Sequence, residues 1–323
     1  MNKNIGYAIA LAIALAAPFV GYPVFLMKLL CFSLFACAFN LLIGFTGLLS
    51  FGHAAFFGGA GYLAGYALRD LGWPFELGLL AGVVGAALIG LVMGSLAIRR
   101  QGIYFSMITL ALAQMVYFGA LRAPFTGGED GLQGVPRGKL FGAIDLANDT
   151  VLYFVVLAIC VAGFALIVRT VHSPFGQVLK AIKANEPRAI SLGYDVDKYK
   201  LMAFVLSAAL AGLAGATKTV VLGFETLTDV HWTMSGLVIL MTLVGGMGTL
   251  AGPILGALII IMLENKLGDI GTFLARNTGV EWFNTLGEAV SMVTGLIFVA
   301  CVLLFRRGIV GEIVARFDRK KPA

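Results

Sequence analysis

The chain has 323 residues, of which 59% are hydrophobic and only 12% are charged. A soluble globular protein is about 45–50% apolar and about 25% charged, so this composition excludes a water-exposed globule with an ordinary polar surface. The mean hydropathy of +0.94 and repeated apolar runs near the length of about 20 residues that crosses a bilayer predict an all-α integral membrane protein.

We expect a polytopic helix bundle of about ten transmembrane spans with broken helices, forming a single transmembrane domain over residues 1–323. In chain order the spans are expected near residues 5–20, 24–42, 48–68, 76–98, 103–121, 150–168, 201–222, 232–246, 250–263 and 286–305. The first run is expected to be a retained helix, because no cleavage pattern with a polar mature sequence follows it. The eighth and ninth runs, separated by GGMGTLAGP, are separate helices, one broken helix or a re-entrant pair.

Positive charge marks the expected cytoplasmic side. The basic side chains cluster after the fourth span, around residues 169–200 and after the tenth span, at Arg99, Arg100, Arg169, Lys180, Lys183, Arg188, Lys198, Lys200, Arg306, Arg307, Arg316, Arg319, Lys320 and Lys321. Ten spans with both termini in the cytoplasm place all these clusters inside and leave the loop 122–149, in which acids outnumber bases, on the outside. The net charge of +6 therefore indicates topology rather than a nucleic-acid partner. Lys28 and Lys218 are expected near the outer ends of their helices, with their amines reaching water.

Residues for catalysis or cofactor binding are not recognisable in this sequence. There is no P-loop, metal-ligand set, nucleophile–base pair or carboxylate dyad, so no catalytic residue, metal or cofactor is expected and the chain is not expected to be an enzyme. GMGTLA at 246–251 matches G-x-G-x-x-A but lies in an apolar span without a preceding strand, which argues against a dinucleotide site. The cysteines Cys31, Cys37, Cys160 and Cys301 lie in apolar runs and are expected to be buried and free.

Glycines give two different signals. Small residues four apart predict close helix packing at the pairs Gly61/Gly65, Gly90/Gly94 and Gly252/Gly256. The passages 44–62 and 243–257 combine Gly with Ser, Thr or Pro, and such broken helices can flag a substrate path, although helix packing explains them equally well. The candidate path residues are Thr46, Ser50, His53, Tyr104, Thr109, Gln114, Gly245 and Gly248. His53 either lines that path or is a core histidine satisfied by a neighbour.

The stretch 173–196 is the longest polar passage with helical spacing. Ser173-Pro174 can start a helix with one apolar face, and Glu186-Pro187 predicts a bend into a second short helix that ends at Gly193. The apolar face consists of Phe175, Val178, Leu179 and Ile182. By physical reasoning it rests on lipid headgroups, packs against its own bundle or docks in a groove of another protein.

The same stretch resembles the cytoplasmic coupling loop of ABC importer permeases. FGxxLKAIKxNExxAxSLGYDV over 175–196 is followed by YKLMAFVLSAALAGLAGA over 199–216. NLLIGFTGLLSFGHAAFFGGAGY, GIYFSMITLALAQ, TGGEDGLQGVP and LVGGMGTLAGPILGA add further matches in order, so that residues 40–307 resemble the branched-chain amino acid permease family, specifically its LivM-type subunit. Pro187 stands where many members carry another residue.

The resemblance implies a permease subunit of an ATP-driven importer for branched-chain amino acids in the bacterial inner membrane. It implies as partners a LivH-like second permease subunit, two cytosolic ATP-binding subunits, a periplasmic solute-binding protein and membrane lipid. The coupling loop, 172–200, would dock on an ATPase through Phe175, Gly176, Leu179, Ile182, Lys183, Glu186, Ala189 and Gly193. Alternatives are an importer for urea, amides or aromatic acids and, from other classes, a passive channel or a secondary transporter, which would more often carry an intramembrane acid.

Overall fold

The computed structural model describes residues 11–19, 21–278, 292–293, 295–296, 299, 303 and 308–312. The expected tenth span lies largely outside these residues, and both chain termini lie outside them entirely. Among the described residues, the helices long and apolar enough to cross a membrane are α2 (Pro23–Phe45), α4 (Phe75–Ala97), α5 (Ile103–Arg122), α6 (Asp149–His172) and α9 (Val196–Leu222). Each lies within a few residues of an expected span, so these spans are confirmed as helices.

The remaining helices differ more from the expected spans. A short helical stretch ends in η1 (Ala17–Phe19), and α3 (His53–Arg69) begins five residues later than expected, because residues 46–52 are not helical. The eighth and ninth spans are separate helices, α11 (Trp232–Gly245) and α12 (Gly252–Thr278), which pack against each other. Residues 246–251, called the break below, separate them, and Gly246 and Gly248 there have φ values of +125° and +79°.

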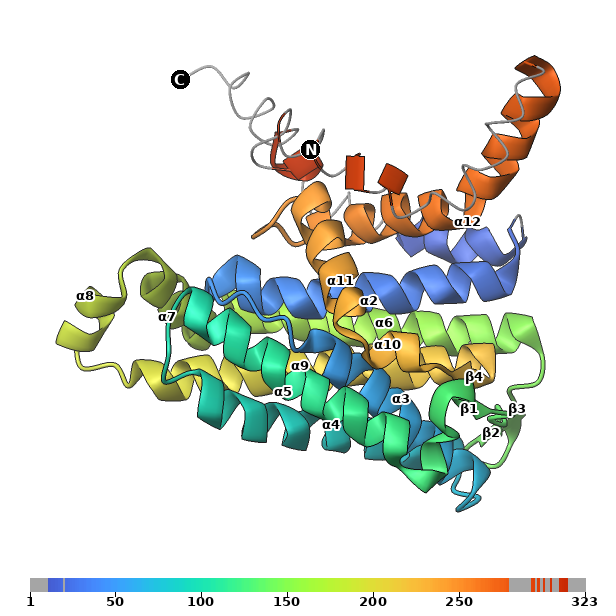
Figure 1. Ribbon diagram of the computed structural model, residues 1–323, viewed down its shortest axis with the longest axis horizontal. Coiled ribbons are helices and arrows are strands. Elements are labelled where there is room, and N and C mark those ends of the chain that lie inside the picture. The colour runs from blue at the N-terminus through green and yellow to red at the C-terminus, as the bar shows by residue number, and fades with distance from the viewer. Residues whose placement is uncertain are drawn as a thin grey trace.

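Helix α9 forms the centre of the bundle, where it packs against α2, α3 and α4 (Figure 1). Small residues permit this, because a Cβ at Gly215 would collide with the Phe57 carbonyl oxygen of α3 and one at Gly90 of α4 would lie 2.5 Å from Ala208 Cβ. On the other side, α2 packs against α6, α11 and α12. The predicted packing role of the glycine pairs is confirmed. Cys31, Cys37 and Cys160 are buried and free as expected, whereas Cys301 lies outside the described residues.

The two ends of the bundle carry different structures (Figure 1). At one end lie η2 (Pro124–Thr126), η3 (Gly128–Asp130), β1 (Leu132–Gln133), β2 (Lys139–Leu140), β3 (Ile144–Asp145) and β4 (Phe224–Glu225). The strands pair antiparallel, with Leu132 opposite Glu225 and Lys139 opposite Asp145. At the other end lie α7 (Pro174–Ala184) and α8 (Glu186–Ser191), whereas α10 (Leu227–Val230) connects β4 to α11. The coupling loop and the loop 122–149 thus lie at opposite ends of the bundle, as the charge pattern predicts.

Candidate functional site

The coupling loop folds through local capping. Ser173 Oγ accepts a hydrogen bond from Gly176 N at 3.3 Å, and Asn185 Oδ1 accepts one from Arg188 N at 3.0 Å, so each short helix begins at a side-chain cap. Asp195 Oδ1 in the same way accepts from Lys198 N at the start of α9. Gly193 has φ +86° and ends α8 in the left-handed region. The predicted pair of short helices and the bend between them are confirmed.

The apolar face of the loop packs inward, against the chain itself. Leu179 and Ile182 are 0% and 2% exposed, and a Cβ on Gly176 would meet the carbonyl oxygens of the last turn of α6. Ile182 forms a small cluster with Ala189, and Phe175 stacks on Tyr199 with ring centroids 5.7 Å apart. Of the arrangements that the sequence left open, these residues adopt packing against their own bundle. Leu179 and Ile182 are buried, Phe175 is half-buried, and the docking role expected of them stays a prediction.

Polar contacts fix the loop to its neighbours. Glu186 Oε1 lies 2.6 Å from Lys200 Nζ of α9 and accepts from Gln101 Nε2, between α4 and α5, at 2.9 Å. Lys183 Nζ donates to the Gly44 carbonyl oxygen in the last turn of α2 at 2.6 Å. Partial burial lowers the pKa of Lys183, because desolvation disfavours the charged amine. The loop therefore contacts α2, α9 and the turn after α4 through charged groups.

The outward surface of the loop carries three exposed apolar side chains, one on α8 and two in the turn that follows it. Ile190, Leu192 and Tyr194 are 57%, 69% and 40% exposed. They lie within three residues of Gly193 in the chain, so the end of α8 and the turn after it expose a patch of apolar side chains, and Arg188 of α8 is exposed as well. These residues, rather than Leu179 and Ile182, form the exposed apolar surface of the loop.

The candidate path residues do not gather at one surface. Thr46, Ser50, His53 and Thr109 are buried, whereas Tyr104 of α5 is 72% exposed. Thr46 and Ser50 lie in the non-helical segment 46–52, His53 is the first residue of α3, and Thr109 of α5 contacts the segment. Among the remaining candidates, Gln114 is half-buried on α5 and Gly245 is buried at the end of α11. Gly248 is half-buried in the break.

The segment 46–52 is held by α5. Thr109 Oγ1 accepts from Phe51 N at 3.2 Å, and Ser106 Oγ donates to the Leu49 carbonyl oxygen at 2.7 Å. Ser50 Oγ accepts from Gly52 N within the same turn. Because these hydroxyls satisfy backbone groups that have no helical partner, they explain how a non-helical segment is tolerated between α2 and α3.

His53 is a buried bridge between helices. Its Nε2 lies 2.9 Å from Ser207 Oγ, and Ser207 donates its hydroxyl proton to the Ala38 carbonyl oxygen at 2.6 Å. Since that proton is used, Nε2 carries the ring proton and donates to Ser207. Phe39 and Phe56 meet the imidazole edge-on at centroid distances of 4.9 and 5.3 Å. Nε2 is thus satisfied by a neighbour and joins α3 to α9 and, through Ser207, to α2, whereas Nδ1 is buried without a hydrogen-bond partner among the described residues.

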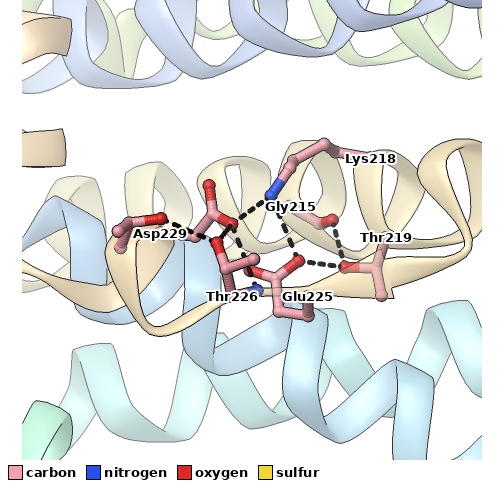
Figure 2. Close-up of polar contacts among 7 residues, drawn as sticks. Gly215, Lys218, Thr219, Glu225, Thr226 and Asp229 are labelled. Carbon is pink, nitrogen blue, oxygen red and sulfur yellow. Dashed lines mark hydrogen bonds and ion pairs between the residues drawn. The ribbon is translucent and has the colours of Figure 1, made fainter. Parts of the chain in front are cut away.

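A buried charge cluster lies at the opposite end from the coupling loop, and sequence reasoning missed it. Lys218 Nζ forms ion pairs with Asp229 Oδ2 and, at 3.3 Å, with Glu225 Oε2 (Figure 2). Lys218 and Glu225 are 3% and 0% exposed, so the expectation that Lys218 reaches water was wrong. Thr219 Oγ1 donates to Glu225 Oε2 at 2.6 Å. The physical reason for the error is that partners in β4 and α10 fold back over the end of α9.

The cluster also packs tightly against α3. A Cβ on Gly61 would lie 2.5 Å from Glu225 Cδ, and Lys218 Nζ lies 5.5 Å from the Phe57 ring centroid. Glu225 Oε1 and Tyr62 Oη are buried without a hydrogen-bond partner among the described residues. A lysine followed by acids at positions +7 and +11 was the available signal, although that spacing alone does not reveal that the chain reverses between them.

Comparison with known proteins places this architecture in a family context. The profile of the family described as "Branched-chain amino acid transport system / permease component" matches residues 22–303. The high-affinity branched-chain amino acid transport system permease protein LivM of Salmonella typhimurium is 27% identical over 263 residues, which cover 72% of this chain and 60% of that protein. LivM of Escherichia coli is 28% identical over 262 residues, with the same coverage of both chains.

A permease named for another solute is also similar. The ribose import permease protein RbsC of Bacillus subtilis is 30% identical over 209 residues, covering 61% of this chain and 58% of that protein. The match to each LivM protein takes in 60% of the relative's length, so it does not extend over those proteins as wholes.

Proposed function

The chain belongs to the family of the branched-chain amino acid transport system permease component, and on that premise we propose that it is one permease subunit of an ATP-driven importer for branched-chain amino acids. Two relatives named as LivM support this class of solute. The similarity to a ribose import permease makes a sugar the second solute class to be tested. A LivH-like subunit, cytosolic ATP-binding subunits and a periplasmic solute-binding protein complete the proposed assembly in the inner membrane.

The coupling loop is the observation that supports this proposal most. Two capped helices project at one end of the bundle, and charged contacts join them to α2 and α9. A passive channel has no need of such an element, whereas a subunit driven from the cytosol needs one that is both exposed and joined to the spans. The loop fits this requirement because its inner face is packed and its outer face exposes the apolar side chains Ile190, Leu192 and Tyr194.

The proposed contact with the ATP-binding subunit is the patch Ile190, Leu192 and Tyr194. Because Leu179 and Ile182 are buried, we propose that they hold the loop in place and that the exposed patch makes the docking contact. We also propose that part of the solute path lies along α5. Only 17% of the residues in its most apolar stretch are buried, the lowest fraction among the long apolar helices described, and Tyr104 is exposed on it.

Transport by the reconstituted complex tests the proposal. The chain is placed in proteoliposomes with the other permease, the ATP-binding subunits and the binding protein, and uptake of leucine, ribose or urea is compared with ATP or a non-hydrolysable analogue inside. We expect leucine uptake only with hydrolysable ATP. Equal uptake with the analogue would refute ATP coupling, and uptake of ribose or urea in place of leucine would reassign the solute.

Docking is tested separately by two aspartate variants. Leu192→Asp should abolish binding of the ATP-binding subunit to the purified permease pair, because it places a charge in the proposed interface. Leu71→Asp is the matched control, since Leu71 is 50% exposed at the opposite end of the bundle. Equal binding by both variants would remove the patch from the interface.

Sidedness is tested by cysteine labelling in intact cells and inverted vesicles. Ala184→Cys in the coupling loop and Glu129→Cys in the loop 122–149 should react from opposite sides of the membrane. The native Cys31, Cys37 and Cys160 are buried and give little background. Labelling of both positions from the same side would break the proposed topology.

A further inference from the structure

The last turn of α2 contacts both the coupling loop and the break. From one side, Lys183 Nζ donates to the Gly44 carbonyl oxygen at 2.6 Å. From the other side, Asn40 contacts residues of the break between α11 and α12. Asn40 and Gly44 are one helical turn apart, and the helix hydrogen bond joins them directly. A single turn of α2 therefore contacts Lys183, which lies 139 positions further along the chain than Gly44, and residues of the break, which lie more than 200 positions beyond Asn40.

Asn40 pairs with the backbone of the break through both ends of its amide. Nδ2 donates to the Thr249 carbonyl oxygen at 2.8 Å, and Oδ1 accepts from Gly248 N at 2.9 Å. Asn40 is 2% exposed and Gly248 and Thr249 are half-buried, so the amide satisfies two backbone groups of the break that have no helical partner. Thr249 closes the turn of the break by donating to the Gly246 carbonyl oxygen at 2.7 Å.

Gly44 lets the backbones touch with no side chain between them. A Cβ there would collide with Asn40 Oδ1 and would lie 2.9 Å from Gly248 N. A Cβ on Gly248 would in turn lie 3.3 Å from the Gly44 carbonyl oxygen, which is the same atom that accepts from Lys183. This carbonyl belongs to the last turn of a helix, where helical partners are absent and a cation is favoured. Gly44 thus lies between the Lys183 amine and the break.

We propose that Lys183, through Gly44 and Asn40, is the positioning residue that transmits movement of the coupling loop to the break between α11 and α12. The proposal rests on the proposed function, because it needs an ATP-driven partner to move the loop. It reassigns Lys183, which sequence reasoning placed at the ATPase contact. The Lys183 amine donates to a backbone oxygen of α2, so the link runs from the Lys183 side chain through the last turn of α2 and the Asn40 amide to the break.

The physical basis is the stiffness of the link. Packed, hydrogen-bonded elements rearrange between discrete positions rather than deforming gradually. The break contains Gly246 and Gly248 at positive φ, which can change conformation at low cost, whereas the turn of α2 is regular helix. Displacing α7 therefore moves the end of α2 as a unit, and the change in conformation falls on the break.

Lys183→Met tests the link, because it keeps the length of the side chain and removes the donor. Transport of solute per ATP hydrolysed should fall at least about tenfold, as expected for loss of a hydrogen bond to a charged group. Lys198→Met is the matched control, since Lys198 is exposed on the same side of the bundle and its ion pair is with Asp195. The control should retain wild-type coupling, and both variants should bind the ATP-binding subunit normally.

A second measurement does not depend on transport. Met247 lies in the break and is 43% exposed, so Met247→Cys can be labelled with a maleimide. Addition of the non-hydrolysable ATP analogue should change the labelling rate in the otherwise wild-type complex and leave it unchanged when Lys183→Met is added. A change of equal size in both backgrounds would overturn the link while leaving the proposed function intact. Wild-type uptake independent of ATP would instead overturn the proposed function and the link with it.

Discussion

Replacement of Lys218 by Met is the sharpest test of the buried charge cluster. The substitution keeps the length of the side chain and removes the only cation among the described residues that is paired with Glu225 and Asp229. Both acids are buried, with Glu225 0% and Asp229 5% exposed, so water cannot replace the lost amine. Glu225 Oε1 already has no hydrogen-bond partner in the described part of the chain, which leaves this carboxyl with little to stabilise a charge.

The magnitude follows from the geometry of the ion pairs. Removing one member of a buried ion pair costs about 3–5 kcal/mol, because the remaining charge stays uncompensated. The lost contact of the amine with the Phe57 ring, 5.5 Å away, adds about 0.5–2 kcal/mol. Uptake of protons by the two carboxyls offsets part of this cost. We therefore expect the free energy of unfolding to fall by about 3–5 kcal/mol.

Unfolding by titration with SDS in mixed micelles, followed by tryptophan fluorescence, measures this loss. The triple variant Lys218→Met/Glu225→Gln/Asp229→Asn removes all the charges together and should recover most of the stability, because no buried charge is left unpaired. Lys198→Met is the control for loss of an exposed lysine, and its unfolding midpoint should be unchanged. A loss below about 1 kcal/mol for Lys218→Met, the range of surface pairs, would refute a buried ion cluster.

Two further predictions concern single contacts. Asp229→Asn should lower the unfolding midpoint more than Glu225→Gln does. Asp229 is the closer partner of Lys218 and also accepts from Thr226 Oγ1 at 2.6 Å, whereas one oxygen of Glu225 makes no hydrogen bond to the described residues. The same SDS titration compares the two variants, and the reverse order of their midpoints would contradict the assignment. Gly256→Ala should prevent folding or lower the yield of folded protein severely, because the new Cβ would collide with the Met241 carbonyl oxygen. Gly119→Ala, where nothing lies within 4 Å of the new Cβ, should express normally on the same size-exclusion assay, and equal behaviour of both glycine variants would contradict the close α11–α12 contact.

Local features of the coupling loop were predictable from sequence. Ser173, Asn185 and Gly193 mark helix starts and a helix end through short-range hydrogen bonds and backbone geometry, which neighbouring residues determine. The long apolar spans were predictable for a similar reason, since length and composition suffice. The pattern at Leu179 and Ile182 indicated an apolar face but not what covers it, because amphipathic spacing does not identify the surface that a helix buries against.

Contacts between distant segments were not predictable in this way. Asn40 lies in an expected span, but an asparagine carries no sign that its partners lie more than 200 residues further on. The acids that pair with Lys218 lie just beyond the end of its helix, and only the reversal of the chain at Gly223, with φ +76°, brings them back over it. Helical spacing does not predict which residues meet where the chain reverses. The expectation that the Lys218 amine reaches water was wrong for that reason.

Helices α9 and α2 are therefore expected to contribute differently to coupling. Buried lysines fix α9 near both ends, Lys200 to Glu186 of the coupling loop and Lys218 to the cluster at the far end. A 27-residue helix held in this way, with small residues packed against α3 and α4, spans about 40 Å and moves as one body. By contrast, α2 ends between the non-helical segment 46–52 and the break, which contain Gly47, Gly246 and Gly248 at positive φ. The coupling loop thus contacts one helix that is fixed at both ends and another that ends between two glycine-containing segments, so motion of the loop relative to α9 passes through the end of α2 to the break.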